Sequence, residues 1–228
     1  MSTVADPRPE FVISIPIYDN VDLMDVAAPT EIFAWLDSVW TERKVKICHT
    51  AAIDAKVITR DGTILYPHAT FAQLPRADLL WTPGGDPDEL CRLMYTESGK
   101  PYLDYLRQVG EFAGWVTSVC EGALLLAQAG LLNGFSATTH WAFMNCLRAF
   151  PEINVIEEGH PRYVIDRNRI TGAGISAGLD EALAIVELLA GAPAAISVQQ
   201  STQYFPKPPV YGTIPPAGEC PVPRNCPD

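Results

Sequence analysis

The feature that most constrains this chain is the segment around Cys120, where a short β-prone run ends at a cysteine and a helix-prone run follows directly. Residues 115–119 are Trp-Val-Thr-Ser-Val, and residues 123–127 are Ala-Leu-Leu-Leu-Ala. Small residues, Ser118 and Gly122, stand two positions before and after the cysteine. This S-x-Cys-x-G spacing is that of a nucleophile elbow with a thiol in place of the usual serine. It predicts a strand–turn–helix that projects Cys120 from the top of a sheet.

A thiol at the start of a helix lies beside unpaired backbone N–H groups and the positive end of the helix dipole. That setting lowers the pKa of a cysteine, and the thiolate is the form that attacks electrophiles. We therefore expect Cys120 to be the nucleophile of a cysteine-dependent enzyme.

Short apolar, β-branched runs alternate with helix-forming segments along the rest of the chain. The predicted strands cover residues 11–17, 45–50, 78–82, 114–119, 136–138, 154–157, 163–166 and 170–172, with a hairpin around residues 60–62. The predicted helices cover residues 30–37, opened by Pro29, and residues 87–94, 98–113, 122–129, 140–149, 177–190 and 193–203. Apolar strands separated by helices indicate an α/β fold, with a mostly parallel sheet covered by helices on both faces.

We expect one domain of fairly large size, since the chain has 228 residues and no internal repeat or linker divides it. Residues 1–10 are predicted to be a disordered arm, residues 11–204 the α/β domain, and residues 205–228 a tail. Prolines crowd the tail, so it cannot form a helix or a central strand. It is interpreted as an extended segment that lies over the surface or over a partner subunit.

Charge and hydropathy exclude several classes of partner. The net charge of −11 argues against nucleic acid and against anionic membranes. No run of about 18 apolar residues is present to cross a bilayer. The first ten residues are polar and contain two prolines, unlike a secretory signal peptide. A cytoplasmic location is therefore expected.

The chain has six cysteines, which are few for its length and irregularly spaced. Without a signal peptide they are interpreted as reduced thiols. No C-x-x-C pair and no clustered His/Cys set indicates a zinc site. Cys48, Cys91 and Cys146 lie in apolar patterns and are expected in the core. Cys220 and Cys226 could pair with each other, but two free thiols in the tail are the preferred interpretation.

Ligands of open parallel sheets bind beyond the carboxyl ends of the strands. Gly84 and Gly85, which follow the predicted strand 78–82, could present backbone N–H groups to a substrate or could form a tight turn. Asp25 lies on the predicted loop after the first strand and could move protons beside the thiol. A helix cap is a less natural role for Asp25, because Pro29 places the predicted helix start later.

Three further candidates keep alternative interpretations. His140 could activate Cys120, or could occupy the first turn of a helix. Glu121 could place a second carboxylate over the site, or could supply favourable charge to the helix start. An ionised, unpaired Glu121 would oppose thiolate formation. Residues 172–178, Gly-Ala-Gly-Ile-Ser-Ala-Gly, contain one residue too many for a dinucleotide-binding motif, and are better explained by close packing near Cys120.

Taken together, these segments resemble the ThiJ/PfpI superfamily and, within it, the isocyanide hydratases. The resemblance runs from about residue 11 to residue 211. It is carried by Leu-x-Asp-Val-x-x-Pro at 23–29, Pro-Gly-Gly at 83–85, Ser-Val-Cys-Glu-Gly at 118–122, Ala-Thr-Thr-His-Trp at 137–141, Thr-Gly-Ala-Gly-Ile-Ser-Ala-Gly at 171–178 and Tyr-x-Pro-x-Pro-Pro at 204–209. Amidase-like domains of transcription regulators share the cysteine and Thr-Thr-His-Trp segments.

The resemblance implies a flavodoxin-like three-layer sandwich, a homodimer, and hydration of an isocyanide to an N-substituted formamide without metal or organic cofactor. Cys120 would form a thioimidate, and Asp25 would act as general acid and base. The remaining implied roles are substrate orientation by Gly84, Gly85 and Glu121, proximity of Ile175 to the sulfur, and supporting positions for His140 and Ser118. The chain departs from the hydratases at Glu121, where they have threonine, and at Ala173, where they have glycine.

Two alternatives to isocyanide hydration stay open. The first is a related hydrolase, amidase or glyoxalase-type enzyme that acts on another small electrophile. The second is a redox-sensing protein in which Cys120 is oxidised without turnover.

Overall fold

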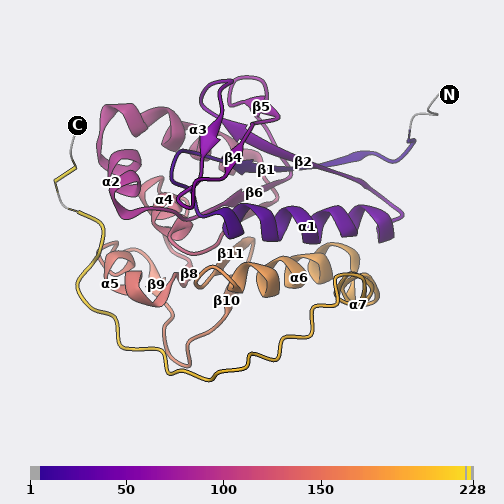
Figure 1. Ribbon diagram of the computed structural model, residues 1–228. Coiled ribbons are helices and arrows are strands. Elements are labelled where there is room, and N and C mark those ends of the chain that lie inside the picture. The colour runs from indigo at the N-terminus through magenta and orange to yellow at the C-terminus, as the bar shows by residue number, and fades with distance from the viewer. Residues whose placement is uncertain (1–5, 224, 227–228) are drawn as a thin grey trace.

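A seven-stranded sheet forms the centre of the molecule in the computed structural model, which describes residues 6–223 and 225–226 (Figure 1). Its order is β10-β11-β7-β6-β1-β2-β5. The bounds are β1 Glu10–Pro16, β2 Lys44–Ala51, β5 Ala69–Thr70, β6 Leu79–Thr82, β7 Trp115–Ser118, β10 Tyr163–Asp166 and β11 Arg169–Gly172. All neighbours are parallel except β10 and β11. The predicted mostly parallel sheet is confirmed.

Two small sheets flank the central one. Strands β3 (Val57–Ile58) and β4 (Ile64–Leu65) form the predicted antiparallel hairpin. Strands β8 (Ser136–Ala137) and β9 (Asn154–Val155) pair in parallel. Strand β5 was not predicted, because a two-residue strand carries almost no periodic signal.

The helices form two groups, each packed together beside the sheet (Figure 1). One group is α1 (Leu23–Val39), α6 (Ala177–Ala190) and α7 (Ala192–Ser201). The other is α2 (Pro87–Tyr95), α3 (Lys100–Phe112), α4 (Gly122–Gln128) and α5 (Met144–Leu147). Short 3₁₀ turns, η1 (Glu97–Gly99) and η2 (Trp141–Phe143), precede α3 and α5. This arrangement confirms the flavodoxin-like sandwich.

The strands nearest the middle of the sheet are buried along most of their length. All four residues of β6 are buried, as are Ser14, Ile15 and Pro16 of β1. Helices on both faces leave these strands no solvent side, which explains why their sequences are apolar without alternation. The carboxyl ends of β6 and β7 therefore emerge side by side from a rigid core.

Helix α1 begins at Leu23, so the prediction that Pro29 opens the helix is wrong. Proline lacks the N–H that would bond to the carbonyl four residues earlier, which is that of Asp25. The buried indole N–H of Trp81 donates to this carbonyl instead, at 2.9 Å. Because the Asp25 carbonyl has this partner, the helix continues past Pro29 without an unpaired buried acceptor. The same bond connects the first turn of α1 to β6.

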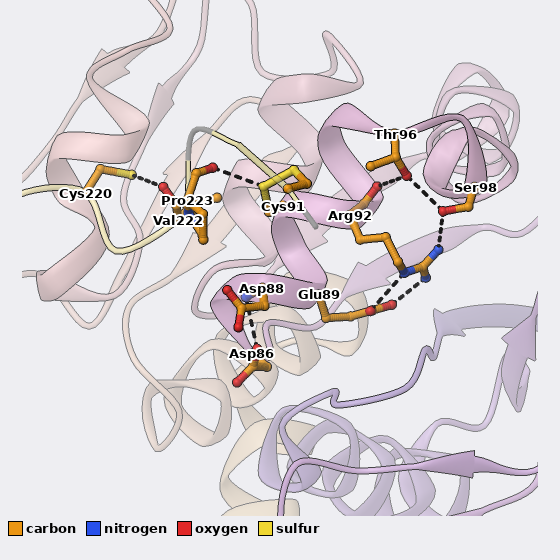
Figure 2. Close-up of a disulfide and its surroundings, with 11 residues drawn as sticks. Asp86, Asp88, Glu89, Cys91, Arg92, Thr96, Ser98, Cys220, Val222 and Pro223 are labelled. Carbon is orange, nitrogen blue, oxygen red and sulfur yellow. Dashed lines mark hydrogen bonds and ion pairs between the residues drawn. A yellow bond between two sulfur atoms is a disulfide. The ribbon is translucent and has the colours of Figure 1, made fainter. Parts of the chain in front are cut away.

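The C-terminal strap (residues 202–223 and 225–226) follows α7 and contains neither helix nor strand. It runs, in yellow, along the lower edge of the molecule toward α5 and α2 (Figure 1). Two disulfides hold it there, Cys146–Cys220 and Cys91–Cys226. Figure 2 shows the attachment at Cys91 on α2, with Val222 and Pro223 of the strap close to it.

The expectation of reduced thiols is therefore wrong for four of the six cysteines. Cys91 and Cys146 are buried as predicted, but each is bonded to the strap, and Cys220 and Cys226 pair with them rather than with each other. The partners are 135 and 74 residues apart in the chain. Spacing alone cannot identify such pairs, because they depend on where the strap returns to the domain.

The segment before β1 is attached to the end of α1. The guanidinium of Arg8 donates to the backbone carbonyls of Asp37, Trp40 and Arg43 at 2.6–3.0 Å. Residues 1–5 of the predicted disordered arm lie outside the described residues, as do residues 224, 227 and 228 of the predicted tail. In the described part of the chain, every helix is too short or too polar to cross a membrane.

Candidate active site

Cys120 lies on the turn between β7 and α4, as the elbow pattern predicts. Its backbone has a φ of +57°, a conformation that is costly for a residue with a side chain. Two flanking segments hold the turn. The Cys120 N–H donates to the carbonyl of Ala173 at 2.9 Å, and the Thr139 hydroxyl donates to the Cys120 carbonyl at 2.7 Å. The strain is thus maintained by contacts from residues distant in the sequence.

Gly122 allows the elbow to pack against the neighbouring strand. A Cβ at this position would overlap the carbonyl oxygen of Thr82 at the end of β6. No larger residue fits without moving β6 or the turn. This close approach accounts for the glycine of the S-x-Cys-x-G pattern.

Asp25 lies in the first turn of α1 and is fully buried beside the thiol. Its Oδ2 accepts a hydrogen bond from the backbone N–H of Gly84 at 2.9 Å, whereas Oδ1 has no partner among the described residues. Trp81 holds the backbone of the same residue. The structure therefore brings together the predicted pair of Cys120 and Asp25.

Glu121 points toward the thiol and is only 4% exposed. A carboxylate oxygen of Glu121 lies within 4.8 Å of the Cys120 sulfur, and the side chain makes no capping hydrogen bond to helix α4. Burial raises the pKa of Glu121 to about 7. Glu121 therefore stands at the start of helix α4 and also adds a second carboxyl group to the site, so both interpretations fit its position.

The pKa values of the titratable groups in the site are raised, which favours their protonated forms. Burial raises the pKa of Cys120 well above its ordinary value, and Glu121 and Asp25 raise it further, while the backbone N–H of Ile175 opposes the shift. Burial likewise raises the pKa of Asp25, against the hydrogen bond from Gly84. The expected lowering of the thiol pKa by the helix N-terminus is thus outweighed by desolvation. Burial thus favours the protonated forms of the thiol and of both carboxyl groups.

Other predicted residues lie around this centre with different contacts. The His140 ring packs over Gly174, and its Nδ1 accepts from the Ala142 N–H at 3.2 Å, so it caps η2. No hydrogen bond between His140 and Cys120 is present among the described residues. Ser118 is buried with its hydroxyl unpaired. Gly85 pairs with Val21 in a short bridge.

Gly84 has a role that differs from the prediction. Its N–H donates to Asp25, so it is not available to a substrate. The glycine is needed because a Cβ would overlap Glu121 Oε2 and would lie 2.9 Å from the Cβ of Cys120. Gly84 therefore positions the acids of the site.

Sequence reasoning missed Asp22 and Arg60. Asp22 immediately precedes α1 and is 6% exposed, and its Oδ1 lies 2.9 Å from Arg60 Nε of the β3–β4 hairpin. The spacing Asp22-x-x-Asp25 places both carboxylates on the same side of a helix start. That signal was hidden because the helix was predicted to begin after Pro29.

Two cavities share Ile175 in their lining, and Cys120 itself lines neither of them. One, of about 350 Å³, is lined by Asp22, Leu23, Met24, Ala27, Arg60, Asp61 and Ile175. The other, of about 280 Å³, is more aromatic and includes His140, Trp141, Met144 and Ile214 of the strap. A larger cavity of about 670 Å³ lies under the strap between Tyr95 and Phe150 and does not include Cys120.

Comparison with known proteins identifies the family of the chain. The model of the DJ-1/PfpI family matches residues 12–188. The isonitrile hydratase of Pseudomonas putida is 36% identical over 198 residues, which cover 86% of this chain and 80% of that protein. The crystal structure of a ThiJ/PfpI family protein from Pseudomonas syringae is 32% identical, with a TM-score of 0.78 over 89% of this chain and 78% of that one.

A regulator shares the same region at lower identity. The HTH-type transcriptional regulator GbdR of Pseudomonas aeruginosa is 27% identical over 176 residues, which are 76% of this chain but 45% of the regulator. The family model covers most of the chain, and two relatives above 30% identity cover 86% and 89% of it. The chain belongs to the DJ-1/PfpI family.

Proposed function

We propose that this chain is an enzyme that hydrates isocyanides to N-substituted formamides, with Cys120 as nucleophile and Asp25 as general acid and base. The observation that carries the proposal is the buried thiol on a strained elbow, with the carboxyl groups of Asp25 and Glu121 within 4.8 Å of it. The similarity to an isonitrile hydratase over most of both chains supports the choice of substrate.

The protonated site suits the first chemical step. The terminal carbon of an isocyanide, R–N≡C, carries a lone pair and can accept a proton. A carboxyl group delivers a proton to this carbon, while the Cys120 sulfur attacks it and passes its own proton to the carboxylate. A C–H and a C–S bond form, the S–H bond breaks, and the product is the thioimidate R–N=CH–S–Cys120. General acid catalysis of this kind contributes about 10²–10⁴-fold to the rate.

The second step consumes one water molecule. Asp25 removes a proton from the water, whose oxygen bonds to the thioimidate carbon, and the nitrogen is protonated. The C–S bond then breaks, the sulfur regains a proton, and R–NH–CHO leaves. The backbone N–H groups of Gly85 and Glu121 remain the proposed donors for the polar intermediate, and Ile175 its proposed apolar neighbour.

Turnover of a simple isocyanide tests the proposal. The purified full chain is incubated with cyclohexyl isocyanide, and formamide is measured by chromatography. We expect turnover by the wild-type protein and none by Cys120→Ala. Cys48→Ala is the matched control, because Cys48 is the other free, buried cysteine. Absence of turnover in the wild type, or its persistence in Cys120→Ala, would contradict the proposal.

A related hydrolase, amidase or glyoxalase-type activity is the second candidate, and Glu121 favours it. The extra carboxyl group makes the site more acidic than a threonine would, which suits a more polar electrophile. A panel of amides, α-oxoaldehydes and isocyanides separates the candidates. Redox sensing receives less support, because a buried thiol with a raised pKa reacts slowly with oxidants.

The oligomeric state, the partners and the location of the chain are further parts of the proposal. We propose a homodimer, which light scattering of the purified chain would test. The net charge of −11 favours a small-molecule substrate over nucleic acid or a membrane surface. The cytoplasmic location stays a prediction, and the two disulfides do not favour it, because disulfides are rare in that compartment.

A further inference from the structure

Four acidic groups meet in the site, although the proposed hydration needs only a nucleophile and a proton carrier. One ligand atom from each of Asp22, Asp25, Cys120 and Glu121 lies within 4.8 Å of those from the other three. Around a zinc ion, with Zn–O of about 2.1 Å and Zn–S of about 2.3 Å, tetrahedral ligand atoms stand about 3.5 Å apart. A modest contraction of these side chains would let all four bind one ion.

Two of these groups carry oxygen atoms that have no partner. Asp25 Oδ1 and Glu121 Oε2 are buried and accept no hydrogen bond from the described residues. An unsatisfied buried carboxyl oxygen costs about 1–3 kcal/mol or more. Both residues are at least nine-tenths buried, and both point into the same cluster. A cation bound between them would satisfy both oxygens.

Once its ligands have lost their protons, the cluster carries more negative charge than the neighbouring cation offsets. In the described part of the chain, Arg60 is the cation that pairs with it, through Asp22. The Arg60 side chain is 50% exposed, so it can turn into solvent and release the Asp22 carboxylate. A cavity of about 350 Å³, lined by Asp22 and Arg60, borders the cluster on the Asp22 side.

The donor set selects the type of cation. A thiolate with carboxylates suits zinc or cadmium, whereas magnesium and calcium prefer oxygen ligands throughout. From the geometry of these four donors, we infer that Asp22, Asp25, Cys120 and Glu121 bind one thiophilic divalent cation, Zn²⁺ or Cd²⁺. The ion replaces the protons of the ligands, which pass to solvent.

Binding occupies the sulfur electron pair that would attack a substrate, so the cation is a reversible inhibitor. This second part rests on the proposed isocyanide hydration, whereas cation binding itself does not. The site therefore regulates the enzyme and does not supply a metal for catalysis.

Cation binding is tested on the full-length protein without substrate. Cd²⁺ is titrated while the ultraviolet absorption of the Cd–thiolate bond is recorded, and Zn²⁺ binding is measured by calorimetry. We expect one ion per chain, no absorption band in Cys120→Ser, and an unchanged titration in Cys48→Ala. Mg²⁺ should produce no binding heat. A titration that lacks saturation at one ion, or a band that persists in Cys120→Ser, would overturn the inference.

Variants of the carboxylates separate a four-ligand site from a cysteine that binds metal alone. Asp22→Asn and Glu121→Gln should each weaken Zn²⁺ binding at least tenfold, whereas Glu152→Gln, an exposed carboxylate, should have no effect. Arg60→Gln should strengthen binding, because Asp22 loses its competing partner. Circular dichroism confirms that each variant is folded. Equal affinity in the wild type, Asp22→Asn and Glu121→Gln would overturn the four-ligand site.

Inhibition is then measured in the hydration assay. We expect stoichiometric Zn²⁺ to stop turnover and a chelator to restore it. Full turnover with the ion bound would refute the inhibitory role. If the wild type hydrates no isocyanide, the proposed function fails, yet the titration without substrate still decides whether the site binds the cation.

Discussion

Cysteines attach the C-terminal strap to the domain, and another cysteine performs the proposed chemistry at the elbow. The two regions differ in what fixes them: packing fixes the elbow, and disulfides fix the strap. The elbow of Cys120 is fixed by packing: Ala173, Thr139 and the end of β6 all contact it. The C-terminal strap has mostly exposed residues and no secondary structure, and it is attached by Cys146–Cys220 and Cys91–Cys226. Reduction should therefore loosen the strap and leave the elbow in place.

The strongest way to break this comparison is to alter the acids that packing holds at the elbow. Asp25→Asn removes the proposed proton carrier but keeps an acceptor for the Gly84 N–H. We expect kcat for isocyanide hydration to fall by about 10²–10⁴-fold. Asp104→Asn, on the exposed face of α3, is the control and should keep full activity. An Asp25→Asn protein with normal kcat would assign the proton transfer to Glu121.

A change in the strap should have the opposite effect: it should lower the free energy of unfolding and leave turnover unchanged. The double variant Cys91→Ser/Cys226→Ser removes both cysteines of one disulfide, whose partners are 135 residues apart in the chain. Removing such a cross-link costs about 2–5 kcal/mol in the free energy of unfolding. Urea denaturation should show this loss, while the turnover of a small isocyanide is retained. If kcat fell and stability did not, the elbow would depend on the strap.

The elbow could be predicted because its signals are local. The β-prone run, the small residues and the helix-forming run stand next to one another in residues 115–127, and the apolar strands follow a pattern that short windows detect. Asp25 and Cys120 were placed at the same sheet edge by the rule for parallel strands. These predictions needed no knowledge of distant contacts.

What could not be predicted depends on such distant contacts. The start of α1 depends on Trp81, which replaces the donor that Pro29 lacks. The orientation of Glu121 depends on Gly84, whose missing Cβ leaves room for the carboxylate. The disulfides depend on the path of the strap, which no periodic pattern describes.

Glu181 of α6 tests the packing between this helix and strand β11, which lies next to the strand that carries the elbow. This residue of α6 is fully buried, and both carboxyl oxygens lack partners among the described residues. A Cβ on Gly172 would overlap its Oε2. Burial raises the pKa of Glu181 well above its ordinary value, with a further contribution from Asp25. The folded state thus holds this proton to higher pH than the unfolded chain does.

The contribution of Glu181 to the free energy of unfolding therefore falls as pH rises above the ordinary pKa of glutamate. The reason is that folded Glu181 keeps a proton that the unfolded chain has lost. Glu181→Met removes the unpaired oxygens at similar volume and should stabilise the protein by about 1–3 kcal/mol at pH 8. Thermal denaturation at pH 5 and pH 8 should show a smaller gain at the lower pH. A gain that is the same at both values would contradict the titration of Glu181.

The smallest expected effect is at Ile214, where the strap comes close to the residues that surround the elbow. Ile214 of the strap lines the cavity of about 280 Å³, together with Ile175 and with Thr139, whose hydroxyl bonds to the Cys120 carbonyl. Because this side chain is 46% exposed, Ile214→Ala removes only part of the cavity wall. We expect KM for a bulky aryl isocyanide to change about two- to tenfold with kcat unchanged, since a pocket methylene is worth about 1–3 kcal/mol when fully enclosed. Val210→Ala, on an exposed part of the strap, is the control. Equal KM values in the wild type and Ile214→Ala would mean that the strap only stabilises the fold, whereas a changed kcat would show that it reaches the reacting atoms.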